Sequence, residues 1–172
     1  MEKTVEYVAE LMEIAAITAP KALGKNYIVT RVIKGEDLRN LGKRMVSYGE
    51  EKGKKNFDRD GKNVLDSQAV LLVGMKDAKA VGLNCGACGF PQCITPNTAT
   101  EPGEFAGPQC PIRVLDMGIA LGSAAKTASM LNVDNRIMYR IGVVAREMRL
   151  MDADFIMGIP LSVSGKSIYF DR

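Results

Sequence analysis

The residues best suited to chemistry in this chain are its four cysteines, Cys85, Cys88, Cys93 and Cys110. Their spacing is C-x2-C-x4-C-x16-C, so a short segment supplies three thiols and a more distant position supplies the fourth. A [4Fe–4S] cluster requires this kind of donor set, because four thiolates must reach the corners of an iron–sulfide cube. The spacing therefore predicts one cluster of the low-potential ferredoxin kind, with these four cysteines as its ligands.

The residues between the cysteines suit a loop that wraps around a bulky cofactor. Gly86 and Gly89 directly follow the first two cysteines, and without a Cβ atom the backbone can curl there and point its amides at the sulfurs. Pro111 suits the first position of a helix, whose positive end would face the negatively charged cluster. We expect Asn84, Gly86 and Gly89 to shape and hydrogen-bond an iron–sulfur binding loop over residues 84–111.

Two other chemistries of clustered cysteines remain as alternatives. Structural zinc sites made of four cysteines usually come as two C-x2-C pairs, whereas Cys93 and Cys110 lie 17 positions apart. Disulfides need an oxidising compartment. The chain has no histidine, which excludes Cys/His zinc sites and removes the usual base of a nucleophilic cysteine.

The composition limits the cellular locations and the kinds of binding partner to be expected for the protein. A formal net charge of +3 over 172 residues gives no sign of the concentrated basic face that nucleic-acid binding needs. No apolar run approaches the roughly 18 to 20 residues of a membrane span. The first residues carry Glu2, Glu6 and Glu10, unlike a signal peptide. We expect a cytoplasmic protein without a membrane span, folded as a single domain over residues 1–172.

The periodicity of apolar residues predicts the elements that position the cysteines. In chain order these are a helix over 5–17, a strand over 25–33, a helix from Gly35, a polar loop or frayed helix end over 50–62, a strand over 69–75, the cysteine loop, a helix over 111–131, a helix from Asp134 to Arg149, and two short strands within 153–170. This order predicts an α+β fold, a single mixed-sheet domain with flanking helices. The cysteine-rich loop would be inserted between the second strand and the long helix.

Small residues form a stripe along the helix that follows the last cysteine, at Gly118, Gly122, Ala125 and Ser129. Each glycine costs about 1 kcal/mol relative to alanine inside a helix, so something should offset the loss. A neighbouring helix, a dimer partner or a flat cofactor could approach closely there. The stripe leaves internal packing and a homodimer interface both open.

The cysteine motif resembles known iron–sulfur motifs. The sequence CGACGFPQC, with CP some 16 residues later, is similar to the motif of the corrinoid protein large subunit in CO dehydrogenase/acetyl-CoA synthase systems. It is also similar to the motif in the B subunit of membrane-bound ferredoxin-oxidising electron-transport complexes. Over nearly its whole length the chain resembles the uncharacterised ferredoxin-domain-containing family of anaerobic bacteria and archaea. That likeness is carried by ITAPKALG, CGACGFPQC, CPIRVLDMGIALGSAAKTASML and DADFIMGIPLSVSGKS.

The frame around the motif resembles a second family, the flavin-dependent nitroreductases. The segments AAITAPKALGKNYIV, IALGSAAKTASMLNV and ADFIMGIPLS carry this likeness. It implies an α+β sandwich that is usually a homodimer with FMN at the subunit interface. The Arg-x-Ser-x-Arg pattern that holds the flavin phosphate in that family is missing from the first helix here.

Three functions follow as hypotheses. The first is an iron–sulfur protein that transfers electrons to or from a redox partner protein. The second is an oxidoreductase, or a subunit of one, with FMN in a nitroreductase-like cleft and an accessory cluster. The third is a zinc-stabilised structural protein. A visible spectrum separates them, because a cluster is brown, flavin adds sharp bands and zinc is colourless.

Overall fold

The computed structural model describes residues 1–95 and 103–170 and forms one α+β unit around a single sheet. In chain order its elements are α1 (Glu2–Thr18), the short 3₁₀ helix η1 (Ala22–Gly24), β1 (Ile28–Ile33), α2 (Gly35–Lys52), α3 (Phe57–Leu65), β2 (Ala69–Met75), α4 (Pro111–Met130), β3 (Asp134–Asn135), α5 (Tyr139–Glu147) and β4 (Phe155–Ser162). The α+β class with flanking helices, predicted from the sequence, is confirmed.

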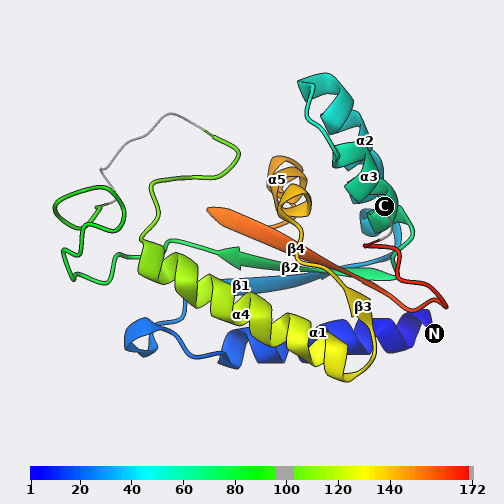
Figure 1. Cartoon of the computed structure of the whole chain (residues 1–172), viewed down its shortest axis with the longest axis horizontal. Coiled ribbons are helices and arrows are strands. Elements are labelled where there is room, and N and C mark those ends of the chain that lie inside the picture. Colours follow the sequence, from blue (N-terminus) through cyan, green and yellow to red (C-terminus); the bar gives the residue numbers. More distant parts are fainter. Residues whose placement is uncertain (96–102, 171–172) are drawn as a thin grey trace.

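The four strands lie in the order β1-β2-β4-β3, with helices on both faces of the sheet (Figure 1). Each described strand pair is antiparallel, so the strand directions differ from the mixed arrangement that we expected. The reason is that α2 and α3 form a helical pair that returns the chain along β1 in the opposite direction, which a single crossover helix would not do.

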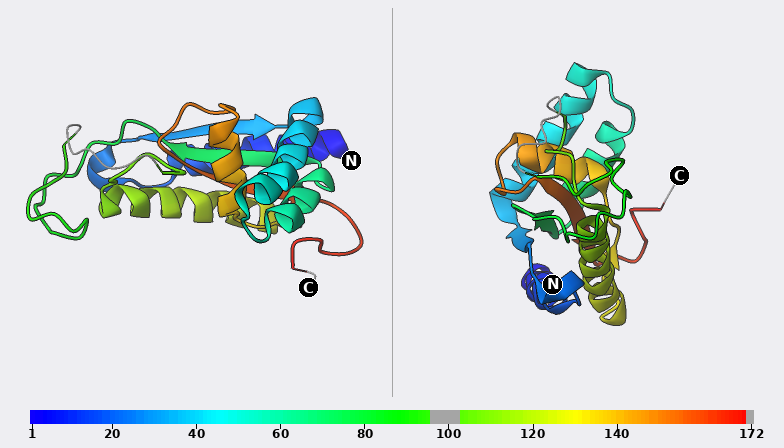
Figure 2. Two further views of the ribbon diagram at one scale, coloured as in Figure 1. Left: turned by 90° about the horizontal axis from the view of Figure 1, so that it is seen from above. Right: turned by 90° about the vertical axis from the view of Figure 1, so that its left-hand side faces the viewer.

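The central strand β2 is buried along its whole length because helices cover both of its faces. Side chains alternate along a strand, so Leu71 and Val73 enter one core while Val70 and Leu72 enter the other. The first core lies under α1 and α4, and the second lies under α2, α3 and α5 (Figure 2). The continuous apolar run of residues 69–75 is explained by this double burial.

Helix α5 packs unusually close to the sheet. A Cβ atom on Gly142 would lie 1.7 Å from the backbone oxygen of Ile156 in β4, so only glycine fits there. On the facing strand, a Cβ on Gly158 would lie 2.1 Å from the side chain of Ile141. This close contact fixes the position of α5, and with it the turn that follows the helix.

Three expected elements are wrong in detail. The segment 50–62, expected to be a loop or a frayed helix end, contains the end of α2 up to Lys52 but also the start of α3, which opens with Phe57, a residue only 2% exposed. Asp134 does not cap a helix; it lies in β3, and α5 begins only at Tyr139. Residues 166–170 form no strand. Instead the buried Tyr169 hydroxyl lies 2.8 Å from the Ser67 hydroxyl, and this contact anchors the tail.

Candidate metal centre

The cysteine loop joins β2 to α4 and projects beyond one end of the sheet, away from both chain termini (Figures 1 and 2). It begins after Met75, where β2 ends, and returns at Pro111, where α4 begins. A loop in this place is held at both ends by rigid elements, while its described residues from Gly82 to Ala87 are exposed to solvent. That arrangement suits a cofactor that must be both bound and accessible.

All four cysteines border one small pocket, although they come from both ends of the loop. Cys110 is buried, Cys88 and Cys93 are partly buried, and Cys85 is exposed. The cavity between them is about 10 Å³, so the loop would have to spread before the atoms of a cube could fit. Within residues 1–95 and 103–170, no three Cys, Asp or Glu side chains already converge as ligands of a single metal ion.

Asn84 ties the two ends of the CGACGFPQC segment together. Its backbone N–H donates to the Cys93 Sγ at 3.3 Å, and its side-chain Oδ1 accepts from the Cys93 N–H at 3.0 Å. The residue adopts a φ of 48°, in the left-handed region that asparagine tolerates better than most residues. These contacts join Asn84 to Cys93, and the role of Asn84 in shaping a cluster-binding loop stays a prediction.

The two glycines of the loop adopt the conformations for which glycine is suited. Gly86 and Gly89 have φ values of 71° and 85°, where other residues are strained. The Gly89 N–H donates to the Gly86 carbonyl oxygen at 2.9 Å and closes a tight turn around Cys88. The turn brings the first two cysteines to the same side of the loop as Cys93.

Cys110 is the residue that precedes the first turn of α4. Burial raises the pKa of its thiol. The backbone N–H groups of Val81, Arg113 and Ile112 lower it, as does the positive charge of Arg113. Together these groups outweigh burial and hold the pKa of Cys110 below its usual value. The site thus favours the thiolate, which is the form that binds metals. The helix beginning at Pro111 adds its positive end at the same point.

A buried ion pair beneath Cys110 is a feature that the sequence analysis missed. Arg113 is 2% exposed, and its Nη1 donates to the Asp116 Oδ2 at 3.0 Å and to the Ala22 carbonyl oxygen at 2.9 Å. Its Nε donates to the Lys79 carbonyl oxygen at 3.0 Å. Asp116 in turn accepts from the Ala22 N–H at 2.8 Å.

The pair joins three segments that are far apart in the sequence: the loop after α1, the entry to the cysteine loop and the start of α4. The guanidinium also lies over the Tyr27 ring, 4.8 Å from its centroid. The sequence contains one signal for this ion pair. An arginine and an aspartate lie three residues apart on a helix face that is otherwise apolar.

The donor set fits an iron–sulfur cluster. Four thiols border one space, loop amides lie near the sulfurs, and no charged residue occurs between Ala80 and Ile94 to compete with them. For flavin, the first helix offers no arginine to hold a phosphate, as the sequence indicated. No helix in the described part of the chain has the length and apolar character needed to cross a membrane.

Comparison with known structures places the frame in the nitroreductase fold. An FMN-dependent nitroreductase from Mycobacterium smegmatis in complex with NADPH matches with a TM-score of 0.61 at 11% identity, over 97% of this chain and 82% of that one. A nitroreductase-like family protein from Bacillus cereus gives 0.60 at 12% identity, over 94% and 75%. A nitroreductase with bound FMN from Desulfitobacterium hafniense gives 0.59 at 12% identity, over 93% and 78%.

Sequence comparison gives a nearer relationship. A protein from Archaeoglobus fulgidus is 47% identical over 169 residues, which is 98% of this chain and 91% of that protein. Residues 106–172 match the family model described as "Uncharacterized protein containing a ferredoxin domain (DUF2148)", a region that includes Cys110. The chain belongs to this ferredoxin-domain-containing family, and its frame is a nitroreductase fold.

Proposed function

We propose that the protein binds one [4Fe–4S] cluster through Cys85, Cys88, Cys93 and Cys110 and transfers electrons to or from a partner protein. The observation that carries the proposal is that all four thiols border one pocket in a loop at the end of the domain. The ferredoxin-domain family supports it. Such a cluster would supply one-electron redox chemistry, and its thiols would need a reducing compartment, which agrees with the expected cytoplasmic location.

The chain's own residues would share the work of holding and tuning the cluster. Cys110 is buried at the start of a rigid helix and would be the fixed corner, whereas Cys85 is exposed and would lie toward a partner. The Arg113 cation lies next to Cys110 and would stabilise the more negative, reduced form. Amide groups such as that of Asn84 would act in the same direction.

Iron and acid-labile sulfide, measured on protein purified without oxygen, test the proposal. We expect iron and sulfide in equal amounts in the wild type and a strong loss of both in Cys110→Ser and Cys93→Ser. Ala87→Ser is the matched control, because it adds a hydroxyl to the same exposed loop and removes no thiol. Full iron and sulfide in the Cys110→Ser variant would show that Cys110 is not a ligand.

The zinc alternative predicts a different result from the same samples. Four thiolates around one zinc would lie about 3.8 Å apart, as tetrahedral bonds of roughly 2.3 Å require. Such a protein would be colourless and free of sulfide, with about one zinc per chain. Zinc in place of iron and sulfide in the anaerobic preparation would overturn the redox role.

A flavin-dependent oxidoreductase with an accessory cluster is the second candidate, and the nitroreductase fold supports it. The test is to denature the purified protein with acid and measure released flavin by fluorescence after chromatography. About one FMN per chain would support this candidate. Absence of flavin, even after incubation with FMN and removal of the excess, would leave the electron carrier as the function.

A homodimer is the assembly that the outer surface of the α1/α4 layer supports. This outer face carries exposed apolar side chains, from α1 Tyr7, Leu11 and Ile14 and from α4 Leu115, Ile119 and Met130. The helices lie side by side over one face of the sheet (Figure 1). Exposed apolar side chains gathered on one layer are typical of an interface.

The glycine stripe of α4 adds to the argument for a dimer. A Cβ atom on Gly118 or Gly122 would meet no described atom within 4 Å, so packing inside the chain does not explain these glycines. A second copy of the chain lying against α4 would explain them. Light scattering after size exclusion should give a dimer for the wild type and for the control Phe170→Glu, and a monomer for Leu115→Glu. A monomeric wild type would rule the dimer out.

A further inference from the structure

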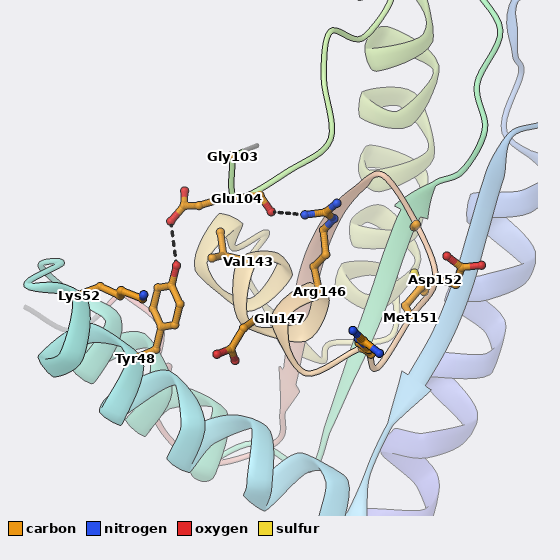
Figure 3. A pocket seen from close by; sticks show the side chains of 11 residues that line it. Tyr48, Lys52, Gly103, Glu104, Val143, Arg146, Glu147, Met151 and Asp152 are labelled. Atoms are coloured by element: carbon orange, nitrogen blue, oxygen red, sulfur yellow. Dashed lines mark hydrogen bonds between the residues drawn. The ribbon is translucent and has the colours of Figure 1, made fainter. Parts of the chain in front are cut away.

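A second cavity lies away from the cysteines, on the opposite face of the sheet from α1 and α4. It has a volume of about 650 Å³ and lies between α2, α5, the segment at Gly103 and the turn that follows α5 (Figure 3). Cavities of roughly 300–1,000 Å³ are the size that small-molecule ligands occupy. The side chains around it are mostly charged, so their pairing decides what the cavity can bind.

The carboxylates that border the cavity already have cationic partners. Glu104 pairs with Lys54 and accepts from the Tyr48 hydroxyl at 3.4 Å. Glu147 lies 2.6 Å from the Arg44 guanidinium. The third carboxylate, at position 152, pairs with the lysine at position 76. Each of these acids therefore already has a cationic partner, although Glu147 shares the Arg44 guanidinium with Glu51.

Three cations border the same cavity without such a partner among the residues of 1–95 and 103–170. Among the residues that the structure describes, no ion pair joins a carboxylate to Lys52, Arg146 or Arg149, and the only acid on which the Lys52 charge acts is its chain neighbour Glu51. The Arg146 Nη1 donates to the backbone oxygen of Glu104 at 3.1 Å, which fixes its guanidinium at the cavity wall and leaves its other donors available (Figure 3). In the described part of the chain, these three cations of the cavity wall are therefore the ones available to an anionic ligand.

The backbone of Arg149 is in a strained conformation. It is the residue after the last turn of α5 and adopts a φ of 55°. Its N–H donates to the Arg146 oxygen at 3.0 Å, and the Leu150 N–H donates to the Ala145 oxygen at 2.9 Å, which is a Schellman ending of a helix. Glycine is the unstrained residue at this position. An arginine there gives the cavity a second guanidinium that the fold itself does not require.

We infer that this cavity binds a small anion with at least two negative charges, either a phosphate ester or a polycarboxylate. Two guanidinium groups and one ammonium group supply charge-assisted hydrogen bonds from different sides, the arrangement that recognises such oxyanions. The paired carboxylates around the cavity would hold the neighbouring backbone and lysines in place rather than contact the ligand. The inference does not depend on the cluster or on flavin.

Isothermal titration calorimetry of the holoprotein at pH 8 and constant ionic strength tests the inference. The probes are inorganic phosphate and malonate, two dianions that differ in chemistry, with chloride as the monovalent reference. We expect saturable binding of at least one dianion and none of chloride. Tighter binding of phosphate would identify the phosphate class, and tighter binding of malonate would identify the carboxylate class.

Variants connect the binding to the cavity. Lys52→Gln and Arg146→Gln should each weaken dianion binding by roughly tenfold or more, as loss of a charge-assisted hydrogen bond does. Arg149→Gly should weaken it similarly and also raise the Tm of the ligand-free protein, because the strain is removed. Lys3→Gln, at an exposed lysine of α1 in the opposite layer, is the control and should change neither. Absence of dianion binding, or binding that none of the three variants alters, would overturn the inference.

Discussion

Replacement of Arg113 by methionine should destabilise the protein far more than replacement of an arginine at the surface. The Arg113 side chain is 2% exposed, and its removal leaves the buried Asp116 carboxylate without its cation. It also leaves the carbonyl oxygens of Lys79 and Ala22 without their donors. Removing one partner of a buried pair costs about 3–5 kcal/mol, out of a total stability of roughly 5–15 kcal/mol.

The structure offers a matched surface control. Arg44 also bridges two acids, Glu51 and Glu147, but its side chain is 25% exposed and theirs are 53% and 40% exposed. Solvent screens such pairs, so Arg44→Met should cost about 0–1 kcal/mol. The double variant Arg113→Met/Asp116→Leu should recover part of the loss, because it removes the orphaned charge together with its partner.

Urea unfolding followed by circular dichroism on the reduced apoprotein measures these differences. The apoprotein is suitable because most of both cores lies outside the cysteine loop. A cost below about 1 kcal/mol for Arg113→Met would refute the reasoning, since the guanidinium would then not be an anchor. In the holoprotein the same variant should lose cluster content, because Arg113 joins the entry to the loop to the helix that presents Cys110.

Three further predictions concern the loop, the sheet and the tail. Asn84→Ala should lower iron and sulfide content, because it removes the side-chain acceptor for the Cys93 N–H and strains a left-handed residue; Asn84→Gly relieves the strain and should lose less. Gly142→Ala should cost more than about 3 kcal/mol in urea unfolding or prevent folding, because its Cβ would lie 1.7 Å from a β4 backbone oxygen. Burial raises the pKa of Tyr169 to about 12, against the opposing effect of hydrogen bonds such as that with Ser67, so stability should be full below the unfolded pKa near 10 and fall as the pH rises toward 12. In Tyr169→Phe that pH dependence should disappear.

The sequence alone predicted those parts of the fold in which local pattern and tertiary burial agree. The apolar run at 69–75 became the doubly buried central strand, and Pro111 opened the long helix as expected. Asn84, Gly86 and Gly89 all adopt left-handed conformations in the loop, while their role in shaping a cluster site stays a prediction. In each case the residue type constrains the backbone directly, so little knowledge of distant contacts was needed.

The parts that could not be predicted depend on contacts between distant segments. The start of α5 is set by the bridge between Met138 and Gly158 in β4, which overrides the capping tendency of Asp134. The C-terminal residues looked like a strand but are held by one buried hydroxyl contact, from Tyr169. The ion pair of Arg113 and the cation-rich cavity also join segments from different elements, and neither has a spacing motif.

The most direct test of the account is Mössbauer spectroscopy of ⁵⁷Fe-enriched protein purified without oxygen, combined with iron and sulfide analysis. The account predicts about four iron and four sulfide per chain, with the spectrum of a cubane whose irons have tetrahedral sulfur ligands. The Cys110→Ser variant should lose that signal. A spectrum without cluster iron, or a single metal ion bound by the thiols of Cys85, Cys88, Cys93 and Cys110, would contradict it.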